Sequence, residues 1–525
     1  MIYNYIVKIM KSNLRKTFFY ALVALFVLGC DSTKKKPNFV FIYTDDQRFD
    51  TVGLIGNNEV KTPHLDDLAN NGAVFSHAYN MGAWHGAICV ASRSMIISGK
   101  SVWNAKREVE ESKDKSELIK NTWPRLFKQN GYNTYMTGKW HVQLPIEKIF
   151  DSIKNKRPGM PDDNRGLFAE GLWKWQKESG NVENLSEYMP IGYGRPVDEF
   201  DKTWNPDDSI HGGFWQGGKH WSEVLADDAN DLIDDAANNQ SPFFMYLAFN
   251  APHDPRQAPK KFLDLYPIDS IKLPPNYMEN HPYFNEIGSM PGVRDESLAP
   301  YPRNEFATKK HIQEYYAIIS HLDEQVGKII DHLKKRDLID NTYIIFTSDH
   351  GLAVGQHGLI GKQSLYDHSI RVPMIISGPD IKKGSWYNQD IYLQDIVPTS
   401  LDLADIEVSS EIDFNSFKEI LFDESSGQIN NGIYGTYGCC PGNYFNYQRI
   451  IRKDGFKLMF FPKNQRIELY NLEDDPFELN NLAGDENYYE KILSLGNDFV
   501  ELQKNYNDTL NIKKIFKNIW KDSKS

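Results

Sequence analysis

The stretch Asn38-Phe39-Val40-Phe41-Ile42-Tyr43-Thr44-Asp45-Asp46-Gln47 is a mostly apolar run that ends abruptly in two carboxylates. An apolar run without polar alternation is typical of a strand buried on both faces of a parallel sheet. Similar runs stand at 243–249, 343–347 and 372–376, with a more polar one at 132–137. We therefore expect several buried strands, the first of them at 38–44.

Amphipathic helices are predicted between these strands, at 62–72, 224–236 and 312–333, where apolar residues recur at helical spacing. Strands alternating with helices indicate an α/β fold with a large doubly wound, mixed and mostly parallel sheet flanked by helices. The pattern changes after residue 425. It predicts a smaller C-terminal antiparallel-sheet subdomain with strands at 447–461 and 465–470 and a helix at 488–506.

The N-terminus has the pattern of a targeting segment. A basic flank precedes an apolar run at 18–28, which is too short to span a bilayer as a helix. The following Val27-Leu28-Gly29-Cys30 resembles a bacterial lipoprotein signal that is cleaved before a lipidated cysteine; an ordinary secretory signal or an anchor helix is the alternative. We expect an exported protein, lipid-anchored at Cys30 on the periplasmic or cell-surface side of a bacterial membrane. The expected organisation is a signal peptide at 1–29, a tether at 30–36, a catalytic domain at 37–425, the C-terminal subdomain at 426–506 and a basic tail at 507–525.

Composition excludes several protein classes. The 525 residues are 40% hydrophobic and 25% charged, which excludes a collagen, a largely disordered chain and a polytopic membrane protein. The net charge of −12 argues against nucleic-acid binding, although a few cations in one pocket can still attract an anionic substrate. Four cysteines are too few for a disulfide framework. The Cys439-Cys440 pair is either a strained disulfide or two thiols.

Polar residues follow four of the expected strands, and they predict one site because ligands of open α/β sheets bind at the carboxyl ends of the strands. Asp45, Asp46 and Asp349 would form an oxygen-rich cage for a hard divalent cation. Calcium is favoured over zinc, since the sequence has no His-Glu-x-x-His motif and no cysteine pairs at zinc spacing. A solvated loop is the alternative for the Asp45-Asp46 pair.

Cys89 lies at an expected loop-to-helix junction in Ile88-Cys89-Val90-Ala91-Ser92-Arg93. A helix N-terminus favours anions, so this cysteine is a candidate functional residue rather than a buried core thiol. Two other motifs fail. Gly99-Lys100-Ser101 resembles the end of a phosphate-binding loop, but Ser94 stands where that loop needs its first glycine. There is no Gly-x-Ser-x-Gly nucleophile elbow.

Cys-x-Ala-Ser-Arg resembles the signature of type I sulfatases of the alkaline phosphatase superfamily, as a variant of Cys-x-Pro-Ser-Arg. Further motifs agree with this resemblance along almost the whole chain, namely the opening strand through Gln47, the helix at 62–69, Gly138-Lys139-Trp140-His141, Ala251-Pro252-His253, Ser348-Asp349-His350-Gly351, Gly361-Lys362 and the C-terminal segment 468–482. The Asp349-His350 pair, in place of the commoner Asp-Asn, resembles bacterial iduronate-2-sulfatase-like enzymes that act on polysaccharides.

The resemblance implies that Cys89 is oxidised to formylglycine (3-oxoalanine) by a formylglycine-generating or an anaerobic sulfatase-maturating enzyme. It implies a Ca2+ ion held by Asp45, Asp46, residue 89, Asp349 and His350. Arg93 would stabilise the hydrated aldehyde, and Lys139 and Lys362 would hold sulfate oxygens. His141 would be the base, and His253, with Lys362, the acid toward the leaving oxygen.

Weaker substrate-binding candidates stand in the long loops. Trp and cations in a glycine-rich loop suit a sulfated sugar, and this set comprises His211, Trp215, Lys219 and His220. Arg256 would meet a uronate carboxylate, and His357 lies in sequence between Asp349 and Lys362.

The function implied is an exported sulfatase that hydrolyses sulfate esters on a sulfated polysaccharide or its oligosaccharides, such as ulvan or a glycosaminoglycan, through a formylglycine sulfate ester. Two alternatives are a phosphodiesterase or phosphonate hydrolase of the same superfamily, and a non-catalytic glycan-binding surface lipoprotein.

Overall fold

The structure is a computed structural model that describes residues 2, 35–161, 165–207, 213–216, 218–289, 292–422, 427–438 and 446–520. The expected signal peptide, Cys30 and the Cys439-Cys440 pair lie outside the described residues. By its internal contacts the chain divides into Met1–Pro37 and Asn38–Ser525, and the fold below is that of the second unit. Within the described residues, no helix combines the length and apolarity needed to cross a bilayer.

An eight-stranded sheet forms the centre of this unit, in the order β13-β2-β12-β10-β1-β9-β5-β6. Its middle strand is β1 (Asn38–Thr44), which pairs in parallel with β10 (Thr342–Ser348) on one side and β9 (Phe243–Ala248) on the other. β5 (Asn133–Lys139) and β6 (Ser152–Arg157) extend the parallel part. The remaining strands, β12 (Met374–Ser377), β2 (Ala73–Phe75) and β13 (Ser385–Tyr387), include antiparallel pairs. The predicted mixed, mostly parallel sheet is confirmed.

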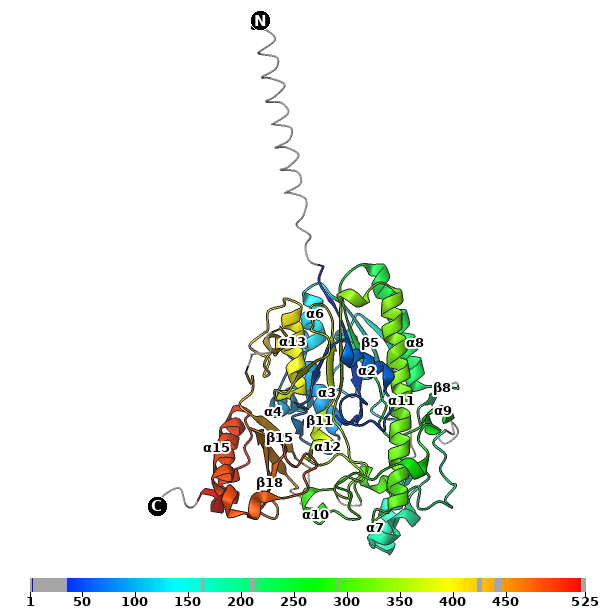
Figure 1. Cartoon of the computed structure of the whole chain (residues 1–525), viewed down its shortest axis with the longest axis vertical. Coiled ribbons are helices and arrows are strands. Elements are labelled where there is room, and N and C mark those ends of the chain that lie inside the picture. Colours follow the sequence, from blue (N-terminus) through cyan, green and yellow to red (C-terminus); the bar gives the residue numbers. More distant parts are fainter. Residues whose placement is uncertain are drawn as a thin grey trace. The chain divides into compact units, whose positions relative to one another are not determined.

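Helices cover both faces of the sheet (Figure 1). Phe39, Phe41 and Tyr43 of β1 face a core shared with α3 (Ile88–Ser98), α6 (Trp123–Gln129) and α13 (Ile396–Leu403). Val40 and Ile42 face the opposite core, shared with α2 (Pro63–Asn70), α8 (Trp221–Asn239) and α11 (Glu305–Lys335). Because successive strand side chains point to opposite faces, an unbroken apolar run is what a doubly covered strand requires.

One predicted strand differs from the structure. The run at 372–376 is divided at Pro373 into β11 (Arg371–Val372), which pairs with β3 (Ala78–Tyr79) in a separate small sheet, and β12 in the central sheet. Proline has no amide hydrogen to donate to a ladder, so it interrupts the pairing.

A second, five-stranded sheet follows towards the C-terminus, in the order β18-β17-β16-β15-β4. β15 (Ile433–Tyr437), β16 (Gln448–Lys453), β17 (Phe456–Phe461) and β18 (Arg466–Asn471) are antiparallel, and α15 (Tyr489–Asn505) packs on them. The predicted C-terminal sheet and helix are thus present. The sheet also takes in β4 (Gly82–Ala83), which pairs in parallel with β15 and comes from the segment just before Cys89.

Candidate active site

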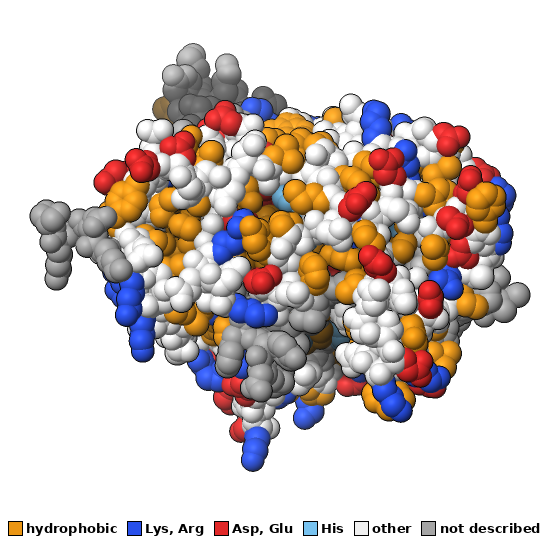
Figure 2. Space-filling model, turned by 90° about the horizontal axis from the view of Figure 1, so that it is seen from below, with side chains coloured by type: hydrophobic (Ala, Val, Ile, Leu, Met, Phe, Trp, Pro, Cys, Tyr) orange, Lys and Arg blue, Asp and Glu red, His pale blue; other side chains and the backbone are white. Residues whose placement is uncertain are grey.

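Four strands of the central sheet end at one place, and their last residues form a buried cluster. Asp45 and Asp46 follow β1, and Asp349 and His350 follow β10, whose Ser348 is in register with Thr44. Lys139 is the last residue of β5, and His253 follows β9. The structure brings all of these predicted residues together. Figure 2 views the molecule from this end, where acidic and basic side chains are scattered among apolar ones instead of forming one charged patch.

Asp45, Cys89, Asp349 and His350 each offer a ligand atom, and these atoms lie within 4.8 Å of one another. Asp46, His253 and Asp254 form an adjoining group of the same kind. Nδ1 of His350 donates to the Gly351 carbonyl at 2.8 Å, which leaves Nε2 as the nitrogen with a lone pair. That Nε2 lies 3.3 Å from Asp46 Oδ1 and 3.6 Å from Asp349 Oδ1 without a hydrogen-bond partner.

These unpartnered atoms fit a metal ion. Asp45 Oδ1 is also buried without a hydrogen-bond donor, and buried polar atoms are rarely left in that state. Three carboxylates suit a hard cation such as calcium, and an imidazole whose other nitrogen is tied to a carbonyl is the usual form of a metal-binding histidine. The residues that would hold the ion are therefore Asp45, Asp46, Asp349 and His350.

Three buried cations balance the three carboxylates. Lys139 donates to Asp45, Lys362 donates to both oxygens of Asp46 at 2.8 and 2.9 Å, and Arg93 Nε donates to Asp349 Oδ2 at 3.0 Å. Burial raises the pKa of Asp46 well above its usual range even though Lys362 lowers it. Burial also acts to raise the pKa of Asp349, but His350, Arg93 and Lys139 together bring it well below its usual range. The cluster thus holds one carboxylate that resists ionisation beside one that is firmly ionised.

Helix α3 carries Cys89, Ser92 and Arg93 on one face, since residues three and four apart are neighbours on a helix. Ser92 Oγ donates to the Asp349 carbonyl at 2.8 Å, while Arg93 also donates to the carbonyls of Lys139 at 3.2 Å and Thr44 at 3.4 Å. The spacing of this motif therefore fixes residue 89 relative to the ends of β1, β5 and β10.

His141 is the nearest proton acceptor to residue 89, with Nδ1 3.4 Å from Cys89 Sγ. Burial, reinforced by the charge of Lys139, lowers the pKa of His141 to about 3. The imidazole is therefore neutral at ordinary pH, the state that a base requires.

His253 is also neutral. Its Nδ1 donates to the Asp254 carbonyl at 2.8 Å, and its Nε2 lies 3.9 Å from Asp46 Oδ2. Burial, and next the charge of Lys362, lower the pKa of His253 well below its ordinary value. To act as the predicted acid, His253 would take up a proton from solvent when substrate binds, because the negative charge of the sulfate ester opposes the effect of Lys362 on the pKa of His253.

Comparison with known proteins identifies the family. The profile described as Sulfatase matches residues 37–406, and the profile described as N-sulphoglucosamine sulphohydrolase, C-terminal, matches residues 355–505. The chain belongs to the sulfatase family. It is a sulfuric ester hydrolase with an alkaline phosphatase-like fold.

The relatives of this sulfatase match most of its length. An arylsulfatase of Clostridium perfringens is 29% identical over 87% of this chain and 92% of its own length. An N-acetylglucosamine-6-O-sulfatase of Bacteroides thetaiotaomicron is 26% identical over 96% of this chain and 93% of its own. A solved structure of a complex with the substrate D-glucosamine-2-N,6-O-disulfate superposes with a TM-score of 0.70 at 23% identity, covering 91% of this chain and 100% of that one.

The predicted substrate-binding residues of this sulfatase do not gather as its catalytic residues do. His211 lies outside the described residues. His220 is fully buried as the N-cap of α8, where Nδ1 accepts from the Ser222 amide and Nε2 donates to the Gln257 carbonyl. Both ring nitrogens are thus engaged, which argues against substrate contact. Trp215 packs its ring on His220, and exposed Lys219 pairs with Asp227 at 2.5 Å.

Arg256 and His357 also have structural partners. Nη1 of Arg256 donates to His311 Nδ1 at 2.8 Å beneath the surface, next to a cavity of only about 30 Å3. A space of that size holds about one water molecule and no carboxylate group of a sugar. His357 stacks on Tyr366 with ring centroids 4.2 Å apart and contacts Asn276, away from the catalytic cluster.

Three residues near the cluster were not predicted from the sequence. Asp254 lies beside His253, and Arg294 joins Asp254 at 3.1 Å to Asp295 at 2.6 Å. Gly159 packs against His141, since a Cβ there would lie 2.4 Å from the imidazole ring. Asp254 could have been predicted, because it directly follows His253 in the sequence. Gly159 and Arg294 could not, because they lie in loops without any motif.

Proposed function

We propose that this sulfatase hydrolyses sulfate esters on the sugars of a sulfated polysaccharide or its oligosaccharides, with formylglycine at position 89 and Ca2+ as its cofactors. The observation that carries the proposal is the position of residue 89, at the N-terminus of α3 within a buried cluster of three carboxylates, three cations and a neutral histidine. A glycosaminoglycan with 6-O-sulfated glucosamine is the first substrate class to test, because one relative is named an N-acetylglucosamine-6-O-sulfatase and one similar solved structure holds D-glucosamine-2-N,6-O-disulfate as its substrate. Ulvan is the second.

Different residues of this chain would have different roles in such a reaction. The group formed from Cys89 would supply an oxygen nucleophile, and calcium would supply positive charge for the sulfate oxygens. Lys139 and Lys362, each paired with a carboxylate here, would turn to the sulfate oxygens as calcium shares those carboxylates. Arg93 and Ser92 hold Asp349 in place.

Proton transfer falls to the two histidines. His141 would accept a proton at Nδ1 from the group at position 89, and His253 would donate one at Nε2 to the sugar oxygen that leaves sulfur. One water is consumed for each ester, and the sugar alcohol and inorganic sulfate are released.

Release of inorganic sulfate tests this proposal. Protein produced in a host with a sulfatase-maturating enzyme is incubated with 6-O-sulfated N-acetylglucosamine, heparan sulfate, ulvan and an aryl phosphate diester. We expect sulfate release from at least one glycan, weak turnover of the diester, and a loss of 18 Da relative to the thiol in the peptide that contains residue 89. An aldehyde-bearing, calcium-loaded protein that releases no sulfate from any glycan would refute the proposal.

Export and anchoring are part of the proposal and rest on residues 18–30 of the sequence alone. Cys30 would carry the lipid. We expect wild-type protein in the membrane fraction of a bacterial host and the Cys30→Ser variant outside it; equal membrane association of the two would contradict lipidation at this residue.

A further inference from the structure

A cavity of about 280 Å3 lies beside the catalytic cluster without including it. Its walls come from the loop after β1, the loop 272–276, α11, Gln356, α12 (Asp367–Ile370) and the C-terminal segment 476–478. Cys89, Lys139, His141 and Lys362 are not among its lining residues. The volume is close to the lower end of the range for small-molecule sites, roughly 300–1,000 Å3, and suits one sugar ring.

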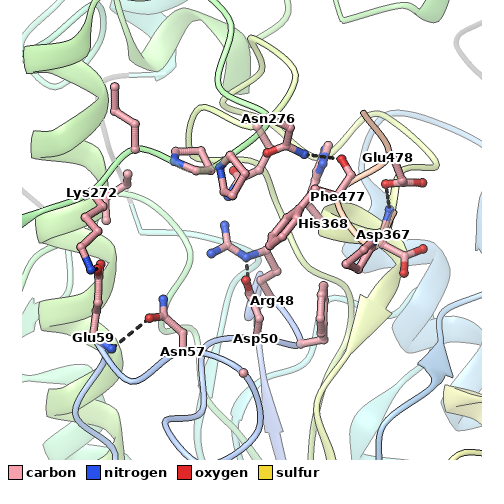
Figure 3. A pocket seen from close by; sticks show the side chains of 18 of the residues that line it. Arg48, Asp50, Asn57, Glu59, Lys272, Asn276, Asp367, His368, Phe477 and Glu478 are labelled. Carbon is pink, nitrogen blue, oxygen red and sulfur yellow. Dashed lines mark hydrogen bonds and ion pairs between the residues drawn. The ribbon is translucent and has the colours of Figure 1, made fainter. Parts of the chain in front are cut away.

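Four buried polar atoms on the residues that line this cavity have no hydrogen-bond partner: Arg48 Nη1, His368 Nδ1, Asn276 Oδ1 and Glu478 Oε1. Glu478 Oε1 forms an ion pair with Lys457. The other three atoms belong to residues that are 4%, 4% and 5% exposed. In Figure 3 the Arg48 guanidinium points into the space between Asn276 and His368 on one side and Lys272 and Glu59 on the other. Unpartnered buried groups of this kind cost free energy unless a ligand or water satisfies them.

The rest of the side-chain chemistry is already paired. Asp50 holds Arg48 by its Nε, and Glu59 pairs with Lys272 at 3.0 Å. Asp367 and Glu478 each pair with Lys457 at 2.6 Å. Glu59, Asp367 and Glu478 are thus engaged with other cations, and Asp50 occupies only the Nε side of Arg48, so the guanidinium edge at Nη1 remains for a further anion. Arginine accepts an oxyanion at such an edge with charge-assisted hydrogen bonds.

Two further polar side chains line the cavity and are also paired: Asn57 donates to the Tyr316 hydroxyl, and Gln356 accepts from the Val354 amide at 2.6 Å. The remaining side chains of the walls are largely apolar, namely Phe49, Leu273, Pro274, Pro275, Ile312, Tyr316, Pro476 and Phe477. Phe477, whose side chain is 43% exposed, stands beside Asn276, which donates to the Phe477 carbonyl at 2.9 Å. The Phe477 ring can pack against the C–H face of a sugar, while Asn276 Oδ1 can accept a hydrogen bond from a sugar hydroxyl.

We infer that this cavity is a second binding site, which takes one sugar unit carrying an oxyanion. The carboxylate or sulfate group binds Arg48, a hydroxyl donates to Asn276, and the ring packs on Phe477. The ligand class follows the proposed function, but the site rests on its own residues. The site adjoins the catalytic cluster through Tyr315, whose hydroxyl accepts from the Arg48 amide at 2.9 Å and donates to the Asp46 carbonyl at 2.6 Å.

Calorimetric titration of the full chain tests the site. The probes are D-glucuronate, inorganic sulfate and D-glucose. Glucose 6-sulfate is a fourth probe and is titrated into the Cys89→Ala variant, which cannot hydrolyse it. We expect saturable binding of glucuronate and glucose 6-sulfate, and binding of glucose and of inorganic sulfate at least tenfold weaker. Arg48→Gln should weaken glucuronate binding at least tenfold, and Phe477→Ala about threefold to tenfold. Lys139→Ala, in the catalytic cluster, should leave it unchanged.

Each other outcome overturns the inference. Equal affinity for inorganic sulfate would mean a simple anion site, and equal affinity for glucose would mean that Arg48 has no role. Loss of glucuronate binding in Lys139→Ala would place that binding in the catalytic cluster. If Arg48→Gln does not fold, the exposed Phe477→Ala decides, since unchanged binding there refutes the site. Failure of the proposed function would appear instead as absent sulfate release with Arg48-dependent binding intact.

Discussion

At the scale of single residues, the site combines ionised groups with histidines that burial keeps neutral. His141 faces residue 89, and His253 faces the carboxylates, so one cluster holds two proton carriers in different surroundings. Their lowered pKa values follow from burial and from the lysines on either side. Both imidazoles are neutral in the protein without substrate. We expect bound substrate to raise the pKa of His253 enough to protonate it, whereas His141 stays neutral and accepts a proton.

Substitution of the histidines separates the two roles. His141→Ala and His253→Ala should each lower sulfate release by about 10²- to 10⁴-fold. Because the pKa of His141 is about 3 without substrate, the acid limb of kcat/KM should not arise from His141 above pH 4. In the pH profile of kcat, which reports the enzyme–substrate complex, His141→Ala should leave the basic limb in place, whereas His253→Ala should remove it. Variants that both keep two ionisations in their pH–rate profiles would contradict these assignments.

Gly159 should matter for catalysis rather than for stability. An alanine Cβ at this position would lie 2.4 Å from the His141 ring, so the imidazole must shift from the position in which its Nδ1 faces residue 89. We expect Gly159→Ala to lower kcat with little change in Tm. The matched control is Gly166→Ala in α7 (Arg165–Glu178), where an added Cβ meets nothing within 4 Å. A Gly159→Ala enzyme as active as that control would show that the His141 position is not critical.

At the scale of secondary-structure elements, the loop that leads to Cys89 is held by the C-terminal sheet. β4 pairs with β15 through Gly82 with Thr436 and Ala83 with Tyr437. The Gln363 side chain also donates to the Gly86 carbonyl at 3.3 Å, next to Lys362. The C-terminal sheet therefore contributes to the site by fixing the approach to α3, although none of its strands supplies a catalytic side chain.

Gly82 is the position where this pairing is most easily broken. Its φ of +104° is unfavourable for other residues, and a Cβ there would lie 1.9 Å from the Thr436 carbonyl oxygen. Gly82→Ala should cost more than about 1 kcal/mol and lower both Tm and activity. Gly484→Ala, where a Cβ meets open space, is the control. Equal stability of the two variants would mean that β4–β15 pairing is dispensable.

At the scale of the whole molecule, a buried charge cluster joins four strands and α3, so ion binding and folding are coupled. Anything that binds only the native state raises its stability, by about 2.7 kcal/mol at a hundredfold excess over Kd. Without an ion, three carboxylates share a small buried volume, and the raised pKa of Asp46 shows that its charge is disfavoured there. Calcium should therefore stabilise the entire second unit.

The calcium effect should grow with pH. A carboxyl whose folded pKa is raised stabilises the fold while it is protonated, and that stability is lost as pH rises through the folded pKa. The Asp46 contribution to the stability of metal-free protein should therefore decline as its carboxyl ionises with rising pH, and added calcium should raise Tm more at pH 8 than at pH 5. Scanning calorimetry with and without EDTA measures this. Asp46→Asn should make the calcium-induced shift in Tm less dependent on pH, and a wild-type calcium shift that is equal at both pH values would contradict the argument.

The sequence determined the scaffold and the catalytic cluster. A strand covered on both faces must be apolar throughout, so the apolar run at 38–44 predicts β1. The helical spacing of apolar residues likewise predicts the long amphipathic helices α8 and α11. The cluster was also foreseeable, because parallel strands deliver their terminal residues to one edge and the Cys89-to-Arg93 spacing places a helix face there. The residue boundary of the C-terminal subdomain and the branch of the family stay predictions.

Only the tertiary structure decided what surrounds that cluster. Pairing of β4 with β15 joins segments more than 350 residues apart, and no local pattern encodes such a contact. The same holds for Gly159 against His141 and for the cavity at Arg48, whose walls come from six separate segments. It also decided that His220 caps a helix and that Arg256 pairs with His311, because burial and hydrogen bonding depend on neighbours in space. The sequence of a loop shows which polar side chains are present, whereas tertiary packing decides which of them can contact a substrate.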